Sequence, residues 1–146
     1  MVRDGKEYDL DAVVVMAKEF WTHTMYADPF DPDHVRFMAA LALDQGLLAI
    51  LEVEGVVEGF CAAVKGPLLG NASVLTATEI AWWVNPKARQ GRNGLSLMKH
   101  IEGMARDQGV KYWNMVVMES CQPEVGAAIY EARGYKKSET SYTRIL

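Results

Sequence analysis

Apolar positions in the first third of the chain recur at helical spacing and predict two helices. The first set comprises Leu10, Val13, Val14, Ala17, Phe20 and Trp21. It predicts a helix that is capped by Asp9 or Asp11 and runs to about residue 26, where a proline-containing segment interrupts it. The second set comprises Val35, Met38, Ala39, Leu41 and Ala42. It predicts a helix from Asp33 to about Asp44, which Gln45-Gly46 ends.

The middle of the chain contains apolar and β-branched runs that are typical of strands. In chain order, the strand patterns cover residues 2–8 (weakly), 47–53, 56–64 and 73–84. Glu54-Gly55 is a hairpin signal, so the two strands that flank it should pair antiparallel. Residues 65–71 contain two glycines and a proline, and this composition predicts a loop.

The last third of the chain alternates helical and strand patterns. They predict a helix over residues 94–108, a strand over 110–118, a helix from Pro123 or Glu124 through Ala132, and a last strand over 135–145. The strand–helix–strand unit from residue 73 to 118 favours a parallel pair with a right-handed crossover. We therefore expect one α+β domain over residues 1–146, with a mixed central sheet flanked by helices on both faces.

Composition and charge narrow the classes of function. The chain of 146 residues has a formal net charge of −4, which argues against a general nucleic-acid binder because such proteins need a basic surface. Its apolar runs are far shorter than the ~18 residues of a membrane span, so no membrane partner is expected. The N-terminus lacks a signal-peptide pattern. Together with the two scattered cysteines, these features favour a cytoplasmic location.

The metal-ligating residue types are too dispersed to suggest a metal site. Cys61 and Cys121 form no CxxC motif, and each is interpreted as a small hydrophobic residue. His23, His34 and His100 form no HxxxH or HExxH pattern. No metal is therefore expected.

The chemically informative segment runs from Glu79 to Met98. A strand ends there, a short basic turn with two glycines follows, and a helix begins. A helix N-terminus presents unpaired N–H groups and the positive end of the helix dipole, which suits a phosphate. Arg89 and Arg92 add positive charge at that point. From these residues alone, a solvated basic loop is favoured slightly over a phosphate site.

The segment resembles motif A of the GNAT (Gcn5-related N-acetyltransferase) family, V-x-P-x-x-R/Q-x-x-G-x-G/A. Val84, Pro86, Arg89 and Gly94 match at the right spacing, whereas Arg92 stands where the family has its first glycine. Divergent GNAT-like proteins of bacteriophages are similar in more detail. The residues that match their pattern are Trp82, Val84, Pro86, Arg89, Gly91, Arg92, Gly94, Leu95, Leu97 and Met98.

A second stretch resembles motif B of the same family, N-x-x-A-I-x-x-Y-x-x-x-G-F/Y. Tyr130, Gly134 and Tyr135 supply the tyrosine, the glycine and the final aromatic residue. Pro123 stands in place of the usual asparagine. The two motifs together imply a GNAT-like fold over most of the chain.

The resemblance implies an acyl-CoA site where two parallel strands part. The backbone at Trp82, Trp83 and Val84 would pair with the pantetheine arm. The pyrophosphate would be held by the turn and the helix start, at Arg89, Gln90, Gly91, Arg92, Asn93, Gly94 and Leu95. Acetyl-CoA is the expected co-substrate.

Two residues are candidates for the chemistry of amine acylation. Tyr130 would donate a proton to the leaving thiolate, as the matching tyrosine does in the family, or else only pack its helix. Glu79 would take the proton of the attacking amine, or else form a surface ion pair. Strand alternation would put Glu79, Ala81 and Trp83 on one face unless a bulge intervenes. Glu119 and Ser120 are weaker candidates.

The resulting hypothesis is an N-acyltransferase that moves an acetyl group from acetyl-CoA to a primary amine. Its acceptor is open, and the family resemblance places the acceptor site near the N-terminal helices. The acidic loop at Asp28, Asp31 and Asp33 would suit a cationic amine or serve only as a solvated turn. The alternatives are an inactive GNAT-like structural or interaction protein and a CoA-binding sensor. A homodimer through the last strand is compatible with the family.

Overall fold

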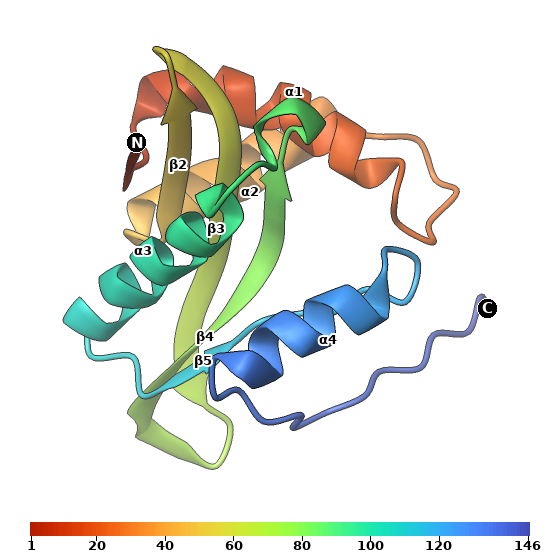
Figure 1. Cartoon of the computed structure of the whole chain (residues 1–146). Coiled ribbons are helices and arrows are strands. Elements are labelled where there is room, and N and C mark those ends of the chain that lie inside the picture. Colours follow the sequence, from red (N-terminus) through yellow and green to blue (C-terminus); the bar gives the residue numbers. More distant parts are fainter. The chain divides into compact units, whose positions relative to one another are not determined.

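Two compact units make up the chain, and the computed structural model describes all residues from 1 to 146. The first unit covers residues 1–116 and the second covers 117–146 (Figure 1). The expectation of a single domain over residues 1–146 stays a prediction.

The first unit contains a sheet and three α-helices. Its elements are β1 Val2–Asp4, η1 Glu7–Asp9, α1 Leu10–Trp21, α2 Pro32–Asp44, β2 Leu48–Val53, β3 Val56–Leu68, β4 Asn71–Val84, η2 Pro86–Ala88, α3 Asn93–Asp107 and β5 Tyr112–Asn114. The five strands follow one another across the sheet in chain order. The first four pair antiparallel, whereas β4 and β5 pair parallel around the crossover helix α3. The hairpin and the parallel pair are both confirmed.

Helices cover both faces of this sheet, as the sequence predicts (Figure 1). On one face α1 and α2 pack against Ile50, Phe60 and Trp83. On the other face α3 packs against Ala49, Cys61 and Val84. Because side chains alternate along each strand, every central strand contributes to both cores. The architecture is a layered α+β arrangement with a mixed sheet.

The N-terminal helices differ from prediction at their ends. The first stops at Trp21 rather than near residue 26. The hydroxyls of Thr22 and Thr24 donate to carbonyl oxygens three residues earlier, at 2.7 and 2.8 Å, and so compete with the helical pattern. The cap of α2 is Asp31 rather than Asp33, since the Asp31 carboxylate accepts the N–H groups of the first turn.

The predicted loop over residues 65–71 is wrong. Strand β3 continues to Leu68 and β4 already begins at Asn71, so the hairpin turn is only two residues long. Pro67 is tolerated because β2 ends opposite Ala62, which leaves β3 with a strand on one side only. Glycine and proline therefore lie within an edge strand instead of a loop.

One corner of the first unit joins the helices of opposite faces. The Lys65 ammonium donates to the carbonyl oxygen of Gln45 at the end of α2, at 3.0 Å, and to the Gln108 side chain just after α3. The Gln108 amide nitrogen donates in turn to the carbonyl oxygen of Gly46, at 2.7 Å. The C-terminal ends of α2 and α3 are thus joined by one set of hydrogen bonds.

The second unit contains one helix, α4 Pro123–Ala132. It confirms the predicted helix. The predicted strand over residues 135–145 is wrong, because no strand or helix forms there. A strand requires a partner edge to satisfy its backbone groups, and the β-prone pattern of residues 135–145 does not by itself provide one. The predicted strand over residues 110–118 is also shorter, with pairing confined to β5.

Candidate active site

The turn between β4 and α3 presents a row of backbone donors. None of the N–H groups from Gln90 to Leu95 donates a hydrogen bond, and the first helical bond of α3 runs from the Ser96 N–H to the Arg92 carbonyl oxygen. The side chain at the N-cap position, Arg92, does not cap the helix. These unsatisfied donors at the positive end of a helix form a cradle that fits a phosphate.

The position of the glycine in this turn has a conformational cause. Gly91 has φ of +65°, a left-handed conformation that side chains disfavour. Arg92 has φ of −108°, which any residue can adopt. The turn therefore requires its glycine at 91 rather than at 92, which accounts for the departure of this chain from the motif A pattern.

Arg89 fastens the turn to the strand that precedes it. Its Nε donates to the Val84 carbonyl oxygen at 2.8 Å, and its guanidinium stacks on the Trp83 ring, 4.5 Å from the centroid. The Asn93 side chain closes the other side of the turn by donating to the Ala88 carbonyl oxygen at 2.9 Å. The Nη groups of Arg89 donate to no protein atom, so they remain able to contact an anion.

A polar network that the sequence did not predict supports the start of the turn. The buried Glu58 carboxylate accepts from the Asn85 side chain at 2.9 Å and pairs with Lys87 at 2.6 Å. Asn85 in turn accepts from the Trp83 indole N–H at 3.1 Å. These bonds from Lys87 and Asn85 lower the pKa of Glu58 in spite of its burial. No local pattern links Glu58 to a turn so far along the chain.

A bulge in β4 decides which way the candidate base points. The register between β3 and β4 shifts so that Ala62 pairs with Ala81 whereas Ala63 pairs with Glu79. Trp83 therefore packs with α1 and α2, whereas Glu79 shares the α3 face with its partner Ala63. The bulge that the sequence analysis allowed for lies at Ile80, so Glu79 does not share a face with Ala81 and Trp83.

Glu79 is a buried carboxyl group with little to stabilise its charge. The residue is 6% exposed, and its Oε2 accepts one hydrogen bond, from the Val116 N–H at 3.1 Å. Burial raises its pKa to about 7, against a small opposing effect of that bond. A carboxyl group with this pKa exchanges protons near neutral pH, which suits a general base. The alternative of a surface ion pair is wrong, because Glu79 is buried and forms none.

The ladder between β4 and β5 is only three residue pairs long, and it ends where Thr78 pairs with Asn114. Beyond that point β4 has β3 on one side and no strand on the other. β5 ends at this point, and the open edge of β4 that begins next to Glu79 is called the fork. This fork lies along the half of β4 that leads to the turn before α3.

The other predicted residues are placed within their own units. Leu95 and Gly94 lie in the first turn of α3, and a β-carbon at Gly94 would meet the Trp82 ring at 3.4 Å. Tyr130 is buried on α4, with its ring 5.5 Å from that of Tyr135. Its role as an acid stays a prediction. No group of three acidic, histidine or cysteine side chains is placed to hold a metal, and no helix is long and apolar enough to cross a membrane.

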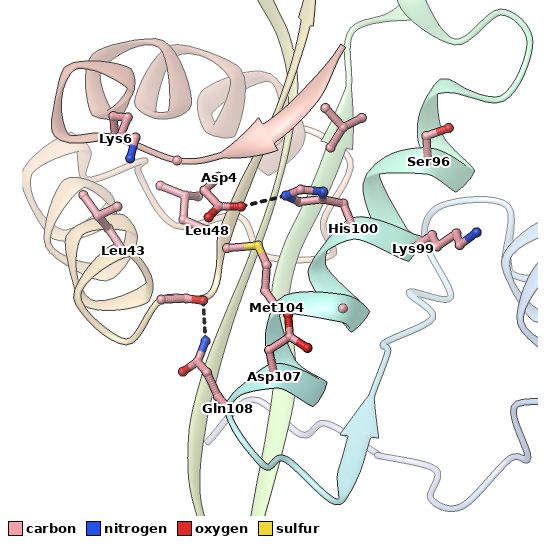
Figure 2. A pocket seen from close by; sticks show the side chains of 14 residues that line it. Asp4, Lys6, Leu43, Leu48, Ser96, Lys99, His100, Met104, Asp107 and Gln108 are labelled. Atoms are coloured by element: carbon pink, nitrogen blue, oxygen red, sulfur yellow. Dashed lines mark hydrogen bonds and ion pairs between the residues drawn. The ribbon is translucent and has the colours of Figure 1, made fainter.

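A hollow of about 750 Å³ lies apart from the turn, between β1, β2, the end of α2 and the flank of α3. Figure 2 shows its centre, where His100 Nε2 and Asp4 Oδ1 lie 2.7 Å apart and Met104 points inward. Lys6, Lys99, Asp4 and Asp107 all border it. None of the residues predicted to bind acyl-CoA or to take part in the chemistry lines this hollow.

Comparison with solved structures identifies the arrangement. A predicted acetyltransferase from Clostridium acetobutylicum with acetyl-CoA superposes with a TM-score of 0.78 at 14% identity, over 100% of this chain and 96% of that one. The chain has the GNAT acetyltransferase fold. A ribosomal-protein-alanine N-acetyltransferase from Brucella melitensis biovar Abortus 2308 gives a TM-score of 0.75 at 14% identity, over 100% and 99% of the two chains.

AAC(6')-Iy in complex with the bisubstrate analogue CoA-S-monomethyl-acetylneamine gives a TM-score of 0.75 at 17% identity, over 100% of this chain and 97% of that one. No family model and no curated protein sequence matches the chain. Similarity at these identities is similarity of fold, and a fold alone does not specify a function. The function must therefore be argued from the turn and the fork.

Proposed function

We propose that the protein is an N-acetyltransferase that moves an acetyl group from acetyl-CoA to a primary amine. The observation that carries the proposal is the run of unsatisfied N–H groups from Gln90 to Leu95, beside Arg92 and at the positive end of α3. Two solved structures of this fold contain acetyl-CoA or a CoA analogue. The likeness to bacteriophage proteins in particular stays a prediction.

The fork between β4 and β5 supports the second half of the cofactor site. Bound acetyl-CoA would supply an activated thioester. Beyond Thr78, β4 lacks a strand on its β5 side, so its backbone from Trp82 to Val84 would pair with the extended pantetheine arm as an added strand does. The turn would then hold the pyrophosphate through Gln90 to Leu95, with Arg89 and Arg92 beside it.

Glu79 would act as the general base. Its carboxylate takes the proton that the amine loses as the nitrogen bonds to the acyl carbon. With a pKa of about 7, Glu79 is largely ionised only above neutral pH. Tyr130 would return a proton to the sulfur as the carbon–sulfur bond breaks. The acceptor is a primary amine, and the acidic loop at Asp28, Asp31 and Asp33 favours a cationic one.

Thermal unfolding with acetyl-CoA tests the cofactor site first. At about 100 times the dissociation constant, linkage predicts about 2.7 kcal/mol of stabilisation, which raises Tm by about 5–10 °C. Arg92→Glu should abolish this shift, because it places a negative charge at the phosphate cradle. A glutamate at a helix N-terminus favours the helix itself, so the loss cannot come from a weakened fold.

Arg144→Glu is the matched control, because it makes the same charge change in the segment that lacks regular structure. It should leave the shift intact. An absent shift in the wild-type protein would overturn the proposal and favour an interaction protein that has this fold. A shift without acetylation of any amine in a screen would favour a CoA-binding sensor.

A further inference from the structure

At the end of the β4–β5 ladder, side chains form hydrogen bonds with backbone groups of the facing segment. Parallel strands normally continue to exchange backbone hydrogen bonds until one of them ends or turns away. Here the pairing stops at Thr78 and Asn114, where β5 ends, whereas β4 continues for six more residues to Val84. The backbone groups at this point have other partners, and those partners come from the opposite strand.

Asn114 provides the first of these contacts. Its side-chain nitrogen donates to the carbonyl oxygen of Ala77 at 3.2 Å. It also lies 3.2 and 3.4 Å from the hydroxyl oxygens of Thr76 and Thr78. A backbone acceptor of β4 is thereby occupied by a side chain of β5, at the last residue of β5 that pairs.

Glu79 provides the second contact, in the opposite direction. Its carboxylate accepts the N–H of Val116, so a backbone donor that follows β5 is occupied by a side chain of β4. Val116 is 48% exposed, and its N–H would otherwise face either water or the β4 backbone. The bulge at Ile80 turns β4 immediately after this contact.

We propose that Asn114 and Glu79 cap the end of the β4–β5 ladder, each from its own strand, and so hold open the fork that receives the pantetheine arm. This inference rests on the proposed function. It assigns Asn114 as a positioning residue, which acts on the ligand through the geometry of β4. The caps prevent the strands from closing on one another by occupying the groups that would otherwise pair.

The binding test compares two ligands. Acetyl-CoA has the pantetheine arm, whereas ADP has the pyrophosphate without it. Asn114→Leu keeps the approximate volume of the side chain and removes its donors. It should raise Kd for acetyl-CoA by about tenfold and leave Kd for ADP within about twofold. Tyr112→Leu, at the other end of the same strand, should change neither value.

Calorimetric titration measures the four dissociation constants, and Tm shows whether each variant is folded. If Asn114→Leu weakened the binding of both ligands equally, or of neither, the assignment of Asn114 as a positioning residue would be wrong. If wild-type protein bound neither ligand, the proposed function would fail instead. The capping contacts are tested separately, by a measurement that needs no ligand.

That measurement is amide hydrogen exchange at Val116, read by NMR. The wild-type N–H should be protected, because it donates to the Glu79 carboxylate. Glu79→Gln retains a side-chain acceptor and should keep the protection, whereas Glu79→Ala should lose at least about tenfold of it. An unprotected Val116 N–H in the wild-type protein would overturn the capping of the fork.

Discussion

Two carboxyl groups of the first unit are both buried, but they differ in the hydrogen bonds and charges around them. Asp9 is 1% exposed and Glu79 is 6% exposed. Asp9 accepts two hydrogen bonds from the Arg3 guanidinium, at 2.7 and 2.9 Å, and a third from the Lys6 N–H at 2.8 Å. Glu79 accepts its single bond from Val116 and has no cation beside it.

The pKa values follow these surroundings. Burial would raise the pKa of Asp9, but the bonds from Arg3 and Lys6 outweigh it and lower the value. For Glu79 burial prevails and raises the pKa to about 7. Asp9 is thus fixed as an anion that ties η1 to β1, whereas Glu79 can change its protonation near neutral pH. Asp9 therefore has a fixed charge, whereas Glu79 can titrate in the pH range that the proposed general base requires.

The largest expected effect comes from removing the cation at Asp9. Arg3→Met should lower the free energy of unfolding by about 3 kcal/mol, because it leaves a buried charge without its partner. Chemical denaturation measures the loss. The double variant Arg3→Met/Asp9→Asn should recover a large part of it, since the uncompensated charge is gone. A single variant as stable as the wild type would mean that Asp9 is not fixed in this way.

The next effect concerns Glu79, whose contribution to stability depends on pH in the opposite sense to that of Asp9. Its folded pKa lies above its ordinary value of 4.5, so its stabilising contribution is complete below pH 4.5 and is lost as pH rises through about 7. Glu79→Gln should therefore be more stable than the wild type at pH 8, by up to about 3 kcal/mol, and equally stable at pH 4.

Denaturation of the two proteins across this pH range measures the effect. The same substitution should abolish most of the acetylation, with wild-type activity rising with pH toward about 8. Equal stability at pH 8 would place the Glu79 carboxyl in a better solvated site than its burial indicates.

The smallest effect is expected at an exposed ion pair. Arg36 on α2 pairs with Asp11 on α1, and their side chains are 46% and 88% exposed. Arg36→Met should cost about 0–1 kcal/mol, because water and salt screen the pair. Denaturation in low and high salt measures it. A loss of stability as large as that of Arg3→Met would show that the exposure of an ion pair does not determine its contribution to stability here.

The order of elements was predictable because it depends on local patterns. Helical spacing and strand runs gave α3, α4 and the β2–β3 hairpin, and the residues of its turn, Glu54 and Gly55, have φ of 51° and 79°. The predictions failed where pairing partners decide the outcome. Pro67 lies in a strand because β3 has a free edge there, and residues 135–145 form no strand although their pattern is typical of one.

The candidate site likewise has parts that local patterns predict and parts that depend on the pairing of strands. The phosphate cradle was predictable, because glycine, arginine and a helix start are adjacent in the sequence. The bulge at Ile80 and the support from Glu58 depend on β3, which precedes the turn by many residues. Asn114 ends a short strand and carries no local signal of its contacts with β4. Such residues are found only once the strands are in register.

The corner where Lys65 and Gln108 join the ends of α2 and α3 bears on how the first unit unfolds. A sheet with one core on each face could lose its helices one face at a time. The contacts of Lys65 with Gln45, and of Gln108 with Gly46, instead couple the ends of helices from both faces. Opening either face disturbs the same contacts, so the two cores are expected to open as one cooperative unit.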